Sequence, residues 1–340
     1  MCNALRRGYG AKVPELGYTL SSEEHSPNDL IAHAKLAEEA GFEFLMISDH
    51  FHPWIDRQGH SPFVWSVLGA LAHETNLEVG TGVTCPIGRI HPVILAQATA
   101  TVAAMMPGRF QFGVGTGEAL NEHITGDVWP EYELRAEMLE EAIELIRELW
   151  KGEQLSHYGE HFTVVNAKVY DTPPEPVPVI YAASGPKAAE RAGRVGDAIV
   201  ITSADKDLVK TFRGAGGRGK PIYGQITVCW SRDEASAKKT LRDIWPNSAI
   251  EGMASQELPL PLHFEQLTQN VTADQLAEHT PCGPDIDRHV AKLQEYVDAG
   301  VDHLYVHQVG PDQQGFIEAY AKDVLPRLRQ GGRTKAASAA

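Results

Sequence analysis

A histidine with an acidic neighbour is the residue pair in this sequence best suited to chemistry. Asp49 and His50 directly follow an apolar run, Phe44–Ser48, and Trp54 comes four residues after the histidine. Imidazole titrates near neutral pH, so His50 is suited to act as a general base. A loop histidine bonded to solvent is the alternative. The position at the end of an expected strand, and the nearby indole, favour the catalytic interpretation.

His50 and His52 also form an H-x-H pair, which on a strand can bind a divalent metal. This pattern keeps a metal-dependent hydrolase of the amidohydrolase type open as an alternative. Such a site needs further histidine ligands after later strands. The chain has Ala182, Ala183 and Ser184 at one of these positions, and Thr202 and Ser203 at the next. We therefore expect no metal.

Glycines mark a second candidate segment, Gly113-x-Gly115-x-Gly117, which is followed by Glu118. Glycines at a strand end let the backbone approach a flat or anionic ligand, and a tight turn is the alternative interpretation. The segment is not a dinucleotide fingerprint, because that motif continues as G-x-G-x-x-G into a helix. A carboxylate at the position of Glu118 can hold or deliver a proton.

The third candidate, Ser184-Gly185-Pro186, begins an expected helix and is followed by Lys187. Free N–H groups at a helix N-terminus bind phosphate. An ordinary helix start with proline in the first turn explains the same residues equally well.

The elements that position these segments alternate between short apolar runs and stretches of helical period, as in βαβ units. Such runs are buried on both faces, as parallel strands are. Eight strands are expected: Glu15–Leu20, Phe44–Ser48, Leu77–Thr81, Phe110–Val114, Val177–Ala182, Ala198–Thr202, Tyr223–Trp230 and His303–His307.

Helices are expected between the strands, with three other segments among them. These are an inserted hairpin over Gln154–Tyr170, a glycine-rich turn over Gly214–Gly219 and a long irregular insertion over Pro246–Pro281. The expected helices are Pro27–Ala40, Pro62–Glu74, Pro92–Met106, Arg135–Trp150, Pro186–Val195, Asp205–Arg213, Asp233–Trp245, Asp285–Ala299 and Phe316–Leu328.

Eight strand–helix pairs predict an α/β fold, a (β/α)8 TIM barrel with insertions, rather than an open doubly wound sheet. We expect one barrel domain over residues 13–330 and a disordered tail over 331–340. Barrel active sites lie at the C-terminal ends of the strands, which would bring the three candidate segments to one mouth.

The net charge of −15, from 30 Lys and Arg against 45 Asp and Glu, argues against nucleic-acid and anionic-membrane partners. The four cysteines form no metal-ligand spacing and are expected to be reduced thiols. The N-terminal residues lack the apolar stretch of a signal peptide, and no run is long enough to span a membrane. We expect a cytoplasmic enzyme with a small-molecule substrate.

Three motifs together resemble the luciferase-like superfamily, and more narrowly the coenzyme F420-dependent glucose-6-phosphate dehydrogenases. They are S-D-H-F-H-P-W at 48–54, G-x-G-T-G-E-A-L-N-E at 113–122 and A-A-S-G-P-K at 182–187, and the resemblance runs from about Leu16 to Arg329. It implies coenzyme F420 as cofactor, a homodimer, and hydride transfer from a hydroxyl-bearing carbon of a sugar, sugar phosphate or alcohol to the deazaflavin. A flavin-dependent luciferase-like monooxygenase is the alternative on the same fold.

The resemblance also implies roles for single residues. His50 is the base, Trp54 lies near the reacting centre, and Glu118 either protonates the reduced ring or orients the substrate. A cis peptide bond is implied at Gly82-Val83, although the family has serine in place of Gly82. The cofactor-binding residues implied are Asp49, Gly82, Val83, Cys85, Asn121, Ala183, Ser184, Gly185 and Thr202.

The implied substrate site departs from the family pattern of two lysines and an arginine around a phosphate. Lys206 matches one lysine with a shift of one residue. Ser255 and His279 occupy the other two positions. The sequence therefore predicts weaker or broader phosphate selectivity than that of the glucose-6-phosphate enzymes.

Overall fold

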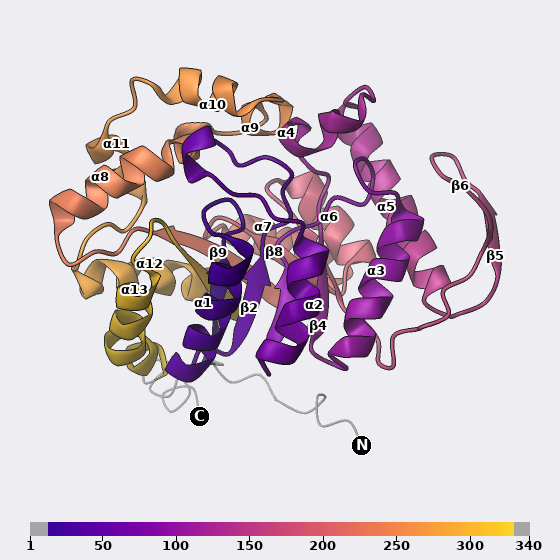
Figure 1. The fold of residues 1–340 in the computed structure, drawn as a ribbon, viewed down its shortest axis with the longest axis horizontal. Coiled ribbons are helices and arrows are strands. Elements are labelled where there is room, and N and C mark those ends of the chain that lie inside the picture. Colours follow the sequence, from indigo (N-terminus) through magenta and orange to yellow (C-terminus); the bar gives the residue numbers. More distant parts are fainter. Residues whose placement is uncertain (1–12, 330–340) are drawn as a thin grey trace.

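Eight parallel strands close into a barrel in the computed structural model, which describes residues 13–329 (Figure 1). The predicted TIM barrel is confirmed. Around the barrel each strand pairs with the next along the chain, and the last strand pairs with the first. The strands are β1 (Glu15–Leu20), β2 (Phe44–Ile47), β3 (Glu78–Thr81), β4 (Phe110–Val114), β7 (Val179–Ala182), β8 (Ala198–Ile201), β9 (Ile222–Val228) and β10 (His303–Gln308).

Burial on both faces explains why these runs form strands. Every residue of β2, β4 and β8 is buried. Inside the barrel, Phe44, Met46, Tyr223 and Tyr305 pack against one another, while a larger core lies between the strands and the surrounding helices. Apolar side chains on both faces leave parallel strands no solvent-exposed side. The barrel is thus a packed frame whose loops are free to carry function.

The helices surround the barrel largely where periodicity predicts them. Helix α1 begins after Ser26, whose hydroxyl accepts from the N–H of Asp29, and it ends before Gly41 in the left-handed region at φ 88°. The helices between strands are α1 (Pro27–Ala40), α2 (Val64–Glu74), α3 (Pro92–Met105), α5 (Tyr132–Leu149), α6 (Pro186–Val195), α7 (Lys206–Phe212), α8 (Glu234–Ile244), α12 (Ile286–Ala299) and α13 (Gln313–Ala319).

Several predicted boundaries are wrong by one to three residues. The predicted strand from Val177 begins only at Val179, because Pro178 has no N–H to donate to a ladder. The predicted strand ending at Trp230 ends at Val228. Beyond it, the backbone of Cys229 forms an isolated parallel β-bridge with that of Cys282 and does not continue the barrel strand; both thiols are free.

The predicted glycine-rich turn over Gly214–Gly219 is also wrong in part. Helix α7 continues into a π-helical turn, Arg213–Gly217, in which only Gly216 leaves helical geometry, at φ 112°. This turn packs closely on α6: a Cβ at Gly193 would meet the carbonyl oxygen of Phe212 at 2.7 Å. The glycines therefore permit helix contact and do not merely end the helix.

The insertion over Pro246–Pro281 is more regular than predicted. It contains the 3-10 turn η4 (Pro246–Ala249) and three short helices, α9 (Ala254–Glu257), α10 (Pro261–Thr268) and α11 (Ala273–His279). A capping box between Thr272 and Gln275 begins the last of them. In Figure 1 these helices, drawn in orange, lie across the top of the barrel. Short helices escape detection because each has too few turns to establish a period.

Two other features complete the fold. The predicted hairpin is present as β5 (Leu155–Tyr158) and β6 (Thr163–Ala167), which extends from the side of the barrel (Figure 1). Helix α4 (Ala119–Glu122) and the 3-10 turn His123–Thr125 follow β4 and were not predicted. Within residues 13–329 no helix is long and apolar enough to cross a membrane.

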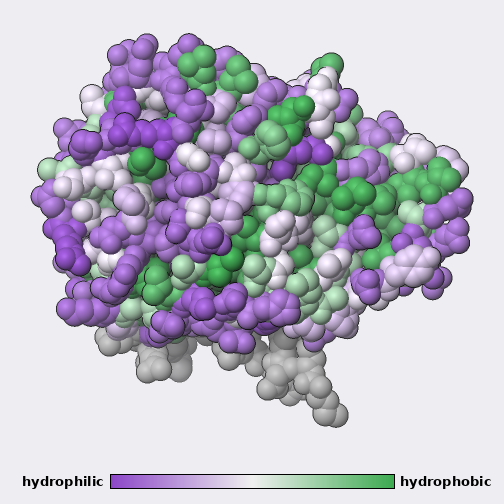
Figure 2. Space-filling model, viewed as in Figure 1, coloured by the Kyte–Doolittle hydropathy of each residue, from purple (hydrophilic) through white to green (hydrophobic). Residues whose placement is uncertain are grey.

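Hydrophobic residues gather on one side of the face drawn in Figure 2, over α3 and the hairpin. Ile94 on α3 and Val165 on β6 are among the exposed apolar side chains. The homodimer implied by the resemblance stays a prediction. The predicted tail over 331–340, and residue 330 of the predicted domain, lie outside the described residues.

Candidate active site

A cavity of about 590 Å³ opens at the C-terminal ends of the strands, and its two walls differ in character. One wall comes from β3, β4, β7, β8 and the residues after them. It is built largely of small or apolar residues, to which Glu118, Ser184, Thr202 and Ser203 add polar groups. The opposite wall comes from β1, β2, β9, β10 and their loops, and it is polar. The first wall includes Gly82, Val83, Gly115, Ala182 and Val200; the second includes Thr19, Ser21, Glu23, Ser48, His50, Gln225, Thr227 and His307.

The apolar wall depends on glycines where two strand ends approach closely. A Cβ at Gly113 would lie 1.8 Å from the carbonyl oxygen of Thr81, and one at Gly115 would lie 2.8 Å from the Val83 side chain. The Gly82–Val83 peptide bond is cis, as the resemblance implies. The G-x-G pattern therefore lets the segment after β3 pack flat against β4. This explains the first two glycines as close-contact positions rather than turn residues.

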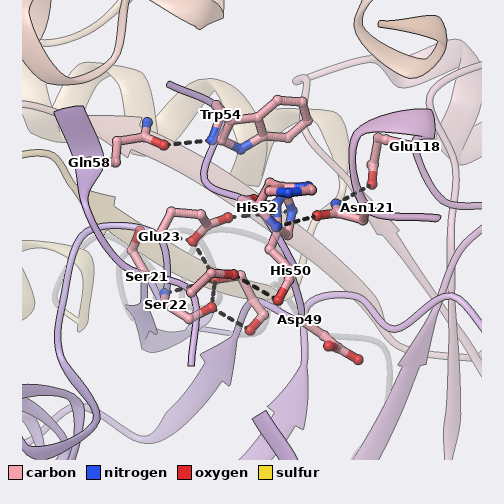
Figure 3. A network of polar contacts seen from close by, with 12 residues as sticks. Ser21, Ser22, Glu23, Asp49, His50, His52, Trp54, Gln58, Glu118 and Asn121 are labelled. Carbon is pink, nitrogen blue, oxygen red and sulfur yellow. Dashed lines mark hydrogen bonds and ion pairs between the residues drawn. The ribbon is translucent and has the colours of Figure 1, made fainter. Parts of the chain in front are cut away.

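His50 stands at the polar wall with its two ring nitrogens in different surroundings (Figure 3). Nδ1 lies 3.2 Å from the carbonyl oxygen of His52, and Nε2 lies 3.4 Å from Oε1 of Glu23. A carbonyl oxygen only accepts, so Nδ1 carries the proton in that contact. The indole of Trp54 lies against the imidazole, with ring centroids 5.0 Å apart. Nε2, beside Glu23, is therefore the nitrogen that can take up a proton.

Glu23 is a site residue that the sequence reasoning missed. Its Oε2 accepts from the Ser48 hydroxyl at 2.6 Å and from the Ser21 hydroxyl at 3.1 Å. Burial alone would raise the pKa of Glu23, but the charge of His50 and the Ser48 hydrogen bond lower that pKa below its ordinary value. Glu23 is thus a buried carboxylate beside the base. The signal in the sequence is its position just after β1, at the C-terminal end of a barrel strand.

Asn121 joins the two motif segments without lining the cavity. Its carboxamide oxygen accepts from the backbone N–H groups of Phe51 and His52, at 2.9 and 3.2 Å. Its amide nitrogen donates to Oε2 of Glu118 at 3.4 Å. Glu118 itself lines the cavity. Asn121 therefore fixes the loop that carries His50 relative to Glu118 (Figure 3).

Asp49 faces away from the cavity into a buried ionic cluster. Its carboxylate accepts from Arg89 at 2.9 Å and from the Thr84 hydroxyl at 2.8 Å. Arg89 also lies 3.6 Å from Glu122, and burial raises the pKa of Glu122 to about 7 despite that cation. Cys85 is buried nearby, and burial raises the pKa of its thiol. The side chains of Asp49 and Cys85 thus support the site from behind.

The H-x-H pair does not converge. His52 Nδ1 lies 2.8 Å from the carbonyl oxygen of Leu120, and its ring stacks on that of His123 at 5.7 Å. His50 is engaged with Glu23 instead. The two imidazoles therefore serve separate contacts.

The start of α6 forms one end of the cavity. Ala183 and Ser184 line it, as do Thr202 and Ser203 after β8, and Gly185 is the N-cap residue of α6, with no side-chain cap bond. Lys187 turns outward to pair with Glu133. The free N–H groups of this helix end are available to an anion.

The three predicted phosphate ligands do not form a cationic cluster. Lys206 is exposed and lies outside the cavity lining. Ser255 lines the cavity but donates its hydroxyl to the carbonyl oxygen of Gly252 at 2.9 Å. His279 lines the mouth and is exposed. Lys292 also lines the cavity, and its ammonium pairs with Glu295 at 2.9 Å.

Comparison with known proteins places this geometry in a family. The chain matches the family model described as luciferase-like monooxygenase over residues 12–303. It belongs to that family. The chain is similar to the F420-dependent glucose-6-phosphate dehydrogenase of Amycolatopsis mediterranei (strain U-32). That relative is 36% identical over 332 residues, which cover 94% of this chain and 99% of the relative.

Two further known proteins are similar to this chain over nearly its whole length. The F420-dependent glucose-6-phosphate dehydrogenase of Segniliparus rotundus is 37% identical over 331 residues, with 93% of this chain and 98% of the relative covered. A solved structure of an F420-dependent secondary alcohol dehydrogenase, in complex with an F420–acetone adduct, superposes with a TM-score of 0.86. It is 29% identical, and the match covers 93% of this chain and 99% of that one.

Proposed function

We propose that this chain is a coenzyme F420-dependent oxidoreductase, specifically a dehydrogenase with His50 as base. It transfers a hydride from a hydroxyl-bearing carbon of a sugar, sugar phosphate or alcohol to the deazaflavin. The observation that carries this proposal is the pairing of His50 with buried Glu23 on a polar wall that faces a flat apolar one. The names of the relatives at 36–37% identity, and of the structure at 29%, support the cofactor.

The apolar wall fits a planar ring system. Gly82, Val83 and Gly115 would lie against the ring, in a cradle that a Cβ at Gly115 would disturb. Ser184 and the free N–H groups at the start of α6 would hold the phosphate of the cofactor. When bound, the deazaflavin supplies the acceptor for the hydride.

The polar wall supplies the proton chemistry. His50 takes the hydroxyl proton of the substrate at Nε2 while Nδ1–H remains bonded to the His52 carbonyl. The Glu23 carboxylate, 3.4 Å away, stabilises the imidazolium that forms. Trp54 covers the imidazole and limits the access of water. Glu118, held by Asn121, orients the substrate or delivers a proton beside the ring.

Among the described residues, the substrate end of the cavity has no cluster of free cations that would select a phosphate group. A dianionic phosphate is usually held by several charge-assisted hydrogen bonds, each worth about 1.5–3 kcal/mol. Here Lys206 is outside the lining, the Ser255 hydroxyl is engaged, and Lys292 is paired. We therefore propose weak or broad selectivity for phosphorylated substrates.

The cofactor is tested by titrating the purified protein separately with coenzyme F420 and with flavin mononucleotide. We expect tight binding of the deazaflavin and weak binding of the flavin. Tight binding of flavin mononucleotide alone would establish the flavin-dependent monooxygenase instead. Activity that a chelator abolishes would favour the metal-dependent hydrolase.

The reaction is tested by a substrate panel with coenzyme F420 that contains glucose, several sugar 6-phosphates and simple secondary alcohols. The absorbance of the oxidised deazaflavin reports turnover. Reduction by at least one of these alcohols is the expected result. Exclusive preference for glucose 6-phosphate would show that our interpretation of the phosphate end is wrong.

A further inference from the structure

Three polar residues lie side by side on the polar wall, beyond the base pair. Thr19 is on β1, His307 on β10 and Thr227 on β9, and all three line the cavity. His307 is level with Thr227 across the ladder. Tyr18 is level with Val306, which sets Thr19 beside His307. Neighbours in register share one face of a sheet, so the three side chains point into the barrel together.

His307 is held in one orientation from behind. Its Nε2 lies 2.6 Å from Oε1 of Glu24, whose other oxygen accepts the N–H of Gly310 at 2.9 Å. The ring of Trp245 meets the imidazole edge to face, with centroids 4.3 Å apart. A carboxylate only accepts, so Nε2 carries the proton and Nδ1 is directed to the other side. There Nδ1 lies 3.4 Å from the hydroxyl of Thr227.

The hydroxyl of Thr19 lacks a partner. It is buried, with 7% of the residue exposed, and within residues 13–329 no group makes a hydrogen bond to it. Leaving a buried polar group unpaired destabilises the folded protein. Because Thr19 lines the cavity, a group bound in the cavity can supply that partner. In the part of the chain that the structure describes, the Thr227 hydroxyl contacts only His307, at 3.4 Å, and it has capacity left for a ligand.

We propose that Thr19, His307 and Thr227 form a specificity-determining subsite for a second, neutral hydroxyl group of the substrate. A ligand hydroxyl donates one hydrogen bond and accepts others, which matches two threonine hydroxyls that each do the same. An alkyl group would leave the Thr19 hydroxyl unpaired. A phosphate would face the buried Glu24 carboxylate behind His307 and be repelled by it. This inference rests on the proposed function and narrows its substrate to one with a hydroxyl besides the group that is oxidised.

The test compares two alcohols that differ by one hydroxyl, 2-butanol and 2,3-butanediol, with the full chain and coenzyme F420. The measured quantity is the ratio of kcat/KM for the diol to kcat/KM for the monool. We expect the wild-type ratio to exceed about 5, since a hydrogen bond contributes about 0.5–1.5 kcal/mol and the subsite offers two. Thr19→Val and Thr227→Val keep the side-chain shape. Each should lower the ratio by about 2- to 10-fold, because the lost hydrogen bond is made only by the diol.

The matched control is Thr101→Val, because Thr101 is exposed on α3 and donates only to its own helix, to the carbonyl oxygen of Gln97. It should leave the ratio unchanged. A wild-type ratio near one, or an equal loss for both alcohols in the two cavity variants, would overturn the subsite. In either case reduction of the deazaflavin would still support the proposed dehydrogenase.

A second readout does not depend on turnover. Isothermal titration of the protein loaded with the reduced deazaflavin, which cannot accept a hydride, measures the same preference as binding of 2,3-butanediol and of 2-butanol. Weaker diol binding in Thr19→Val and Thr227→Val, but not in Thr101→Val, supports the subsite. Diol binding that is equal in all the variants, or absent from the wild type, overturns it. If neither alcohol, nor any of the panel above, reduces the deazaflavin, the proposed function fails separately.

Discussion

His50 and Glu23 form a buried acid–base pair whose members come from two different strand ends. We expect His50→Asn to lower kcat/KM by about 10²- to 10⁴-fold, because asparagine cannot take the hydroxyl proton. The affinity for coenzyme F420 should stay nearly unchanged, since His50 is not among the residues proposed to lie against the ring or to hold the phosphate. Steady-state kinetics and a cofactor titration measure the two quantities. Full activity in His50→Asn, together with loss in Glu118→Gln, would reverse the proposed roles.

Glu23→Gln tests the partner of the base. The variant keeps the hydrogen-bond acceptor for Ser48 but removes the charge beside the imidazole. We expect kcat/KM to fall and the acidic limb of its pH profile to shift to lower pH, because protonated His50 loses a stabilising carboxylate. A loss of activity with no change in the shape of the profile would indicate that Glu23 has only a structural role.

Glu122 makes stability depend on pH in a definite direction. Burial raises its pKa from 4.5 to about 7 in the folded protein, so between these values the folded state holds a proton that the unfolded state has released. This contribution to stability is complete below about pH 4.5 and is lost as the pH rises to about 7. Urea unfolding measures the free energy of unfolding of wild type and Glu122→Gln at several pH values in this range. As the pH rises, wild type should lose on the order of 3 kcal/mol relative to Glu122→Gln. Parallel curves would contradict the assignment.

At the scale of elements, the contact between β4 and the segment after β3 tolerates no side chain. We expect Gly113→Ala to destabilise the protein by about 1–3 kcal/mol, since the new Cβ would meet the backbone oxygen of Thr81 at 1.8 Å. Gly214→Ala is the control, because a Cβ there meets nothing within 4 Å. Thermal unfolding of both variants measures the difference. Equal melting temperatures would mean that the two segments separate readily.

Arg135 anchors the insertion to the barrel. It is fully buried on α5, lies over the Trp129 ring at 4.3 Å, and donates to Gln256 and Glu257 of α9 at 3.0 and 3.1 Å. Arg135→Met keeps much of the apolar stem and removes these charged bonds. We expect a loss of about 1.5–3 kcal/mol in the free energy of unfolding, and faster proteolysis at α9.

The control for this anchor is Glu257→Gln, because the Glu257 side chain is 43% exposed. Exposed ion pairs contribute about 0–1 kcal/mol, so this change should be small. If both variants unfold alike and α9 resists protease in each, the insertion is held by other contacts.

At the scale of the whole molecule, the closure of the barrel joins the two walls into one unit. Strand β1 pairs with β10, so the ends of the chain hold the sheet shut. Coenzyme F420 at about 100 times its Kd should add about 2.7 kcal/mol to the free energy of unfolding. Tryptophan fluorescence and far-ultraviolet circular dichroism should report the same shift. Two separate transitions, or a shift seen by one probe only, would contradict a single cooperative barrel.

The sequence alone determined what depends on neighbours along the chain. Apolar runs of strand length, such as Phe110–Val114, and capped periodic segments, such as Pro27–Ala40, predicted elements that the structure contains with the same bounds. Because parallel strands end at one mouth, the order of elements also predicted that His50, Glu118 and Ser184 share one cavity, and all three line it.

The tertiary structure alone decided which way side chains point and what they meet. Asp49 follows β2 as directly as His50 does, yet it faces Arg89, 40 residues away, while His50 faces Glu23. Lys206 matches the position of a family lysine in sequence, but its side chain lies outside the cavity lining. Such directions depend on loop backbone and on contacts between residues distant in sequence. Periodicity and spacing report only local geometry, so the directions of these side chains could not be predicted from them.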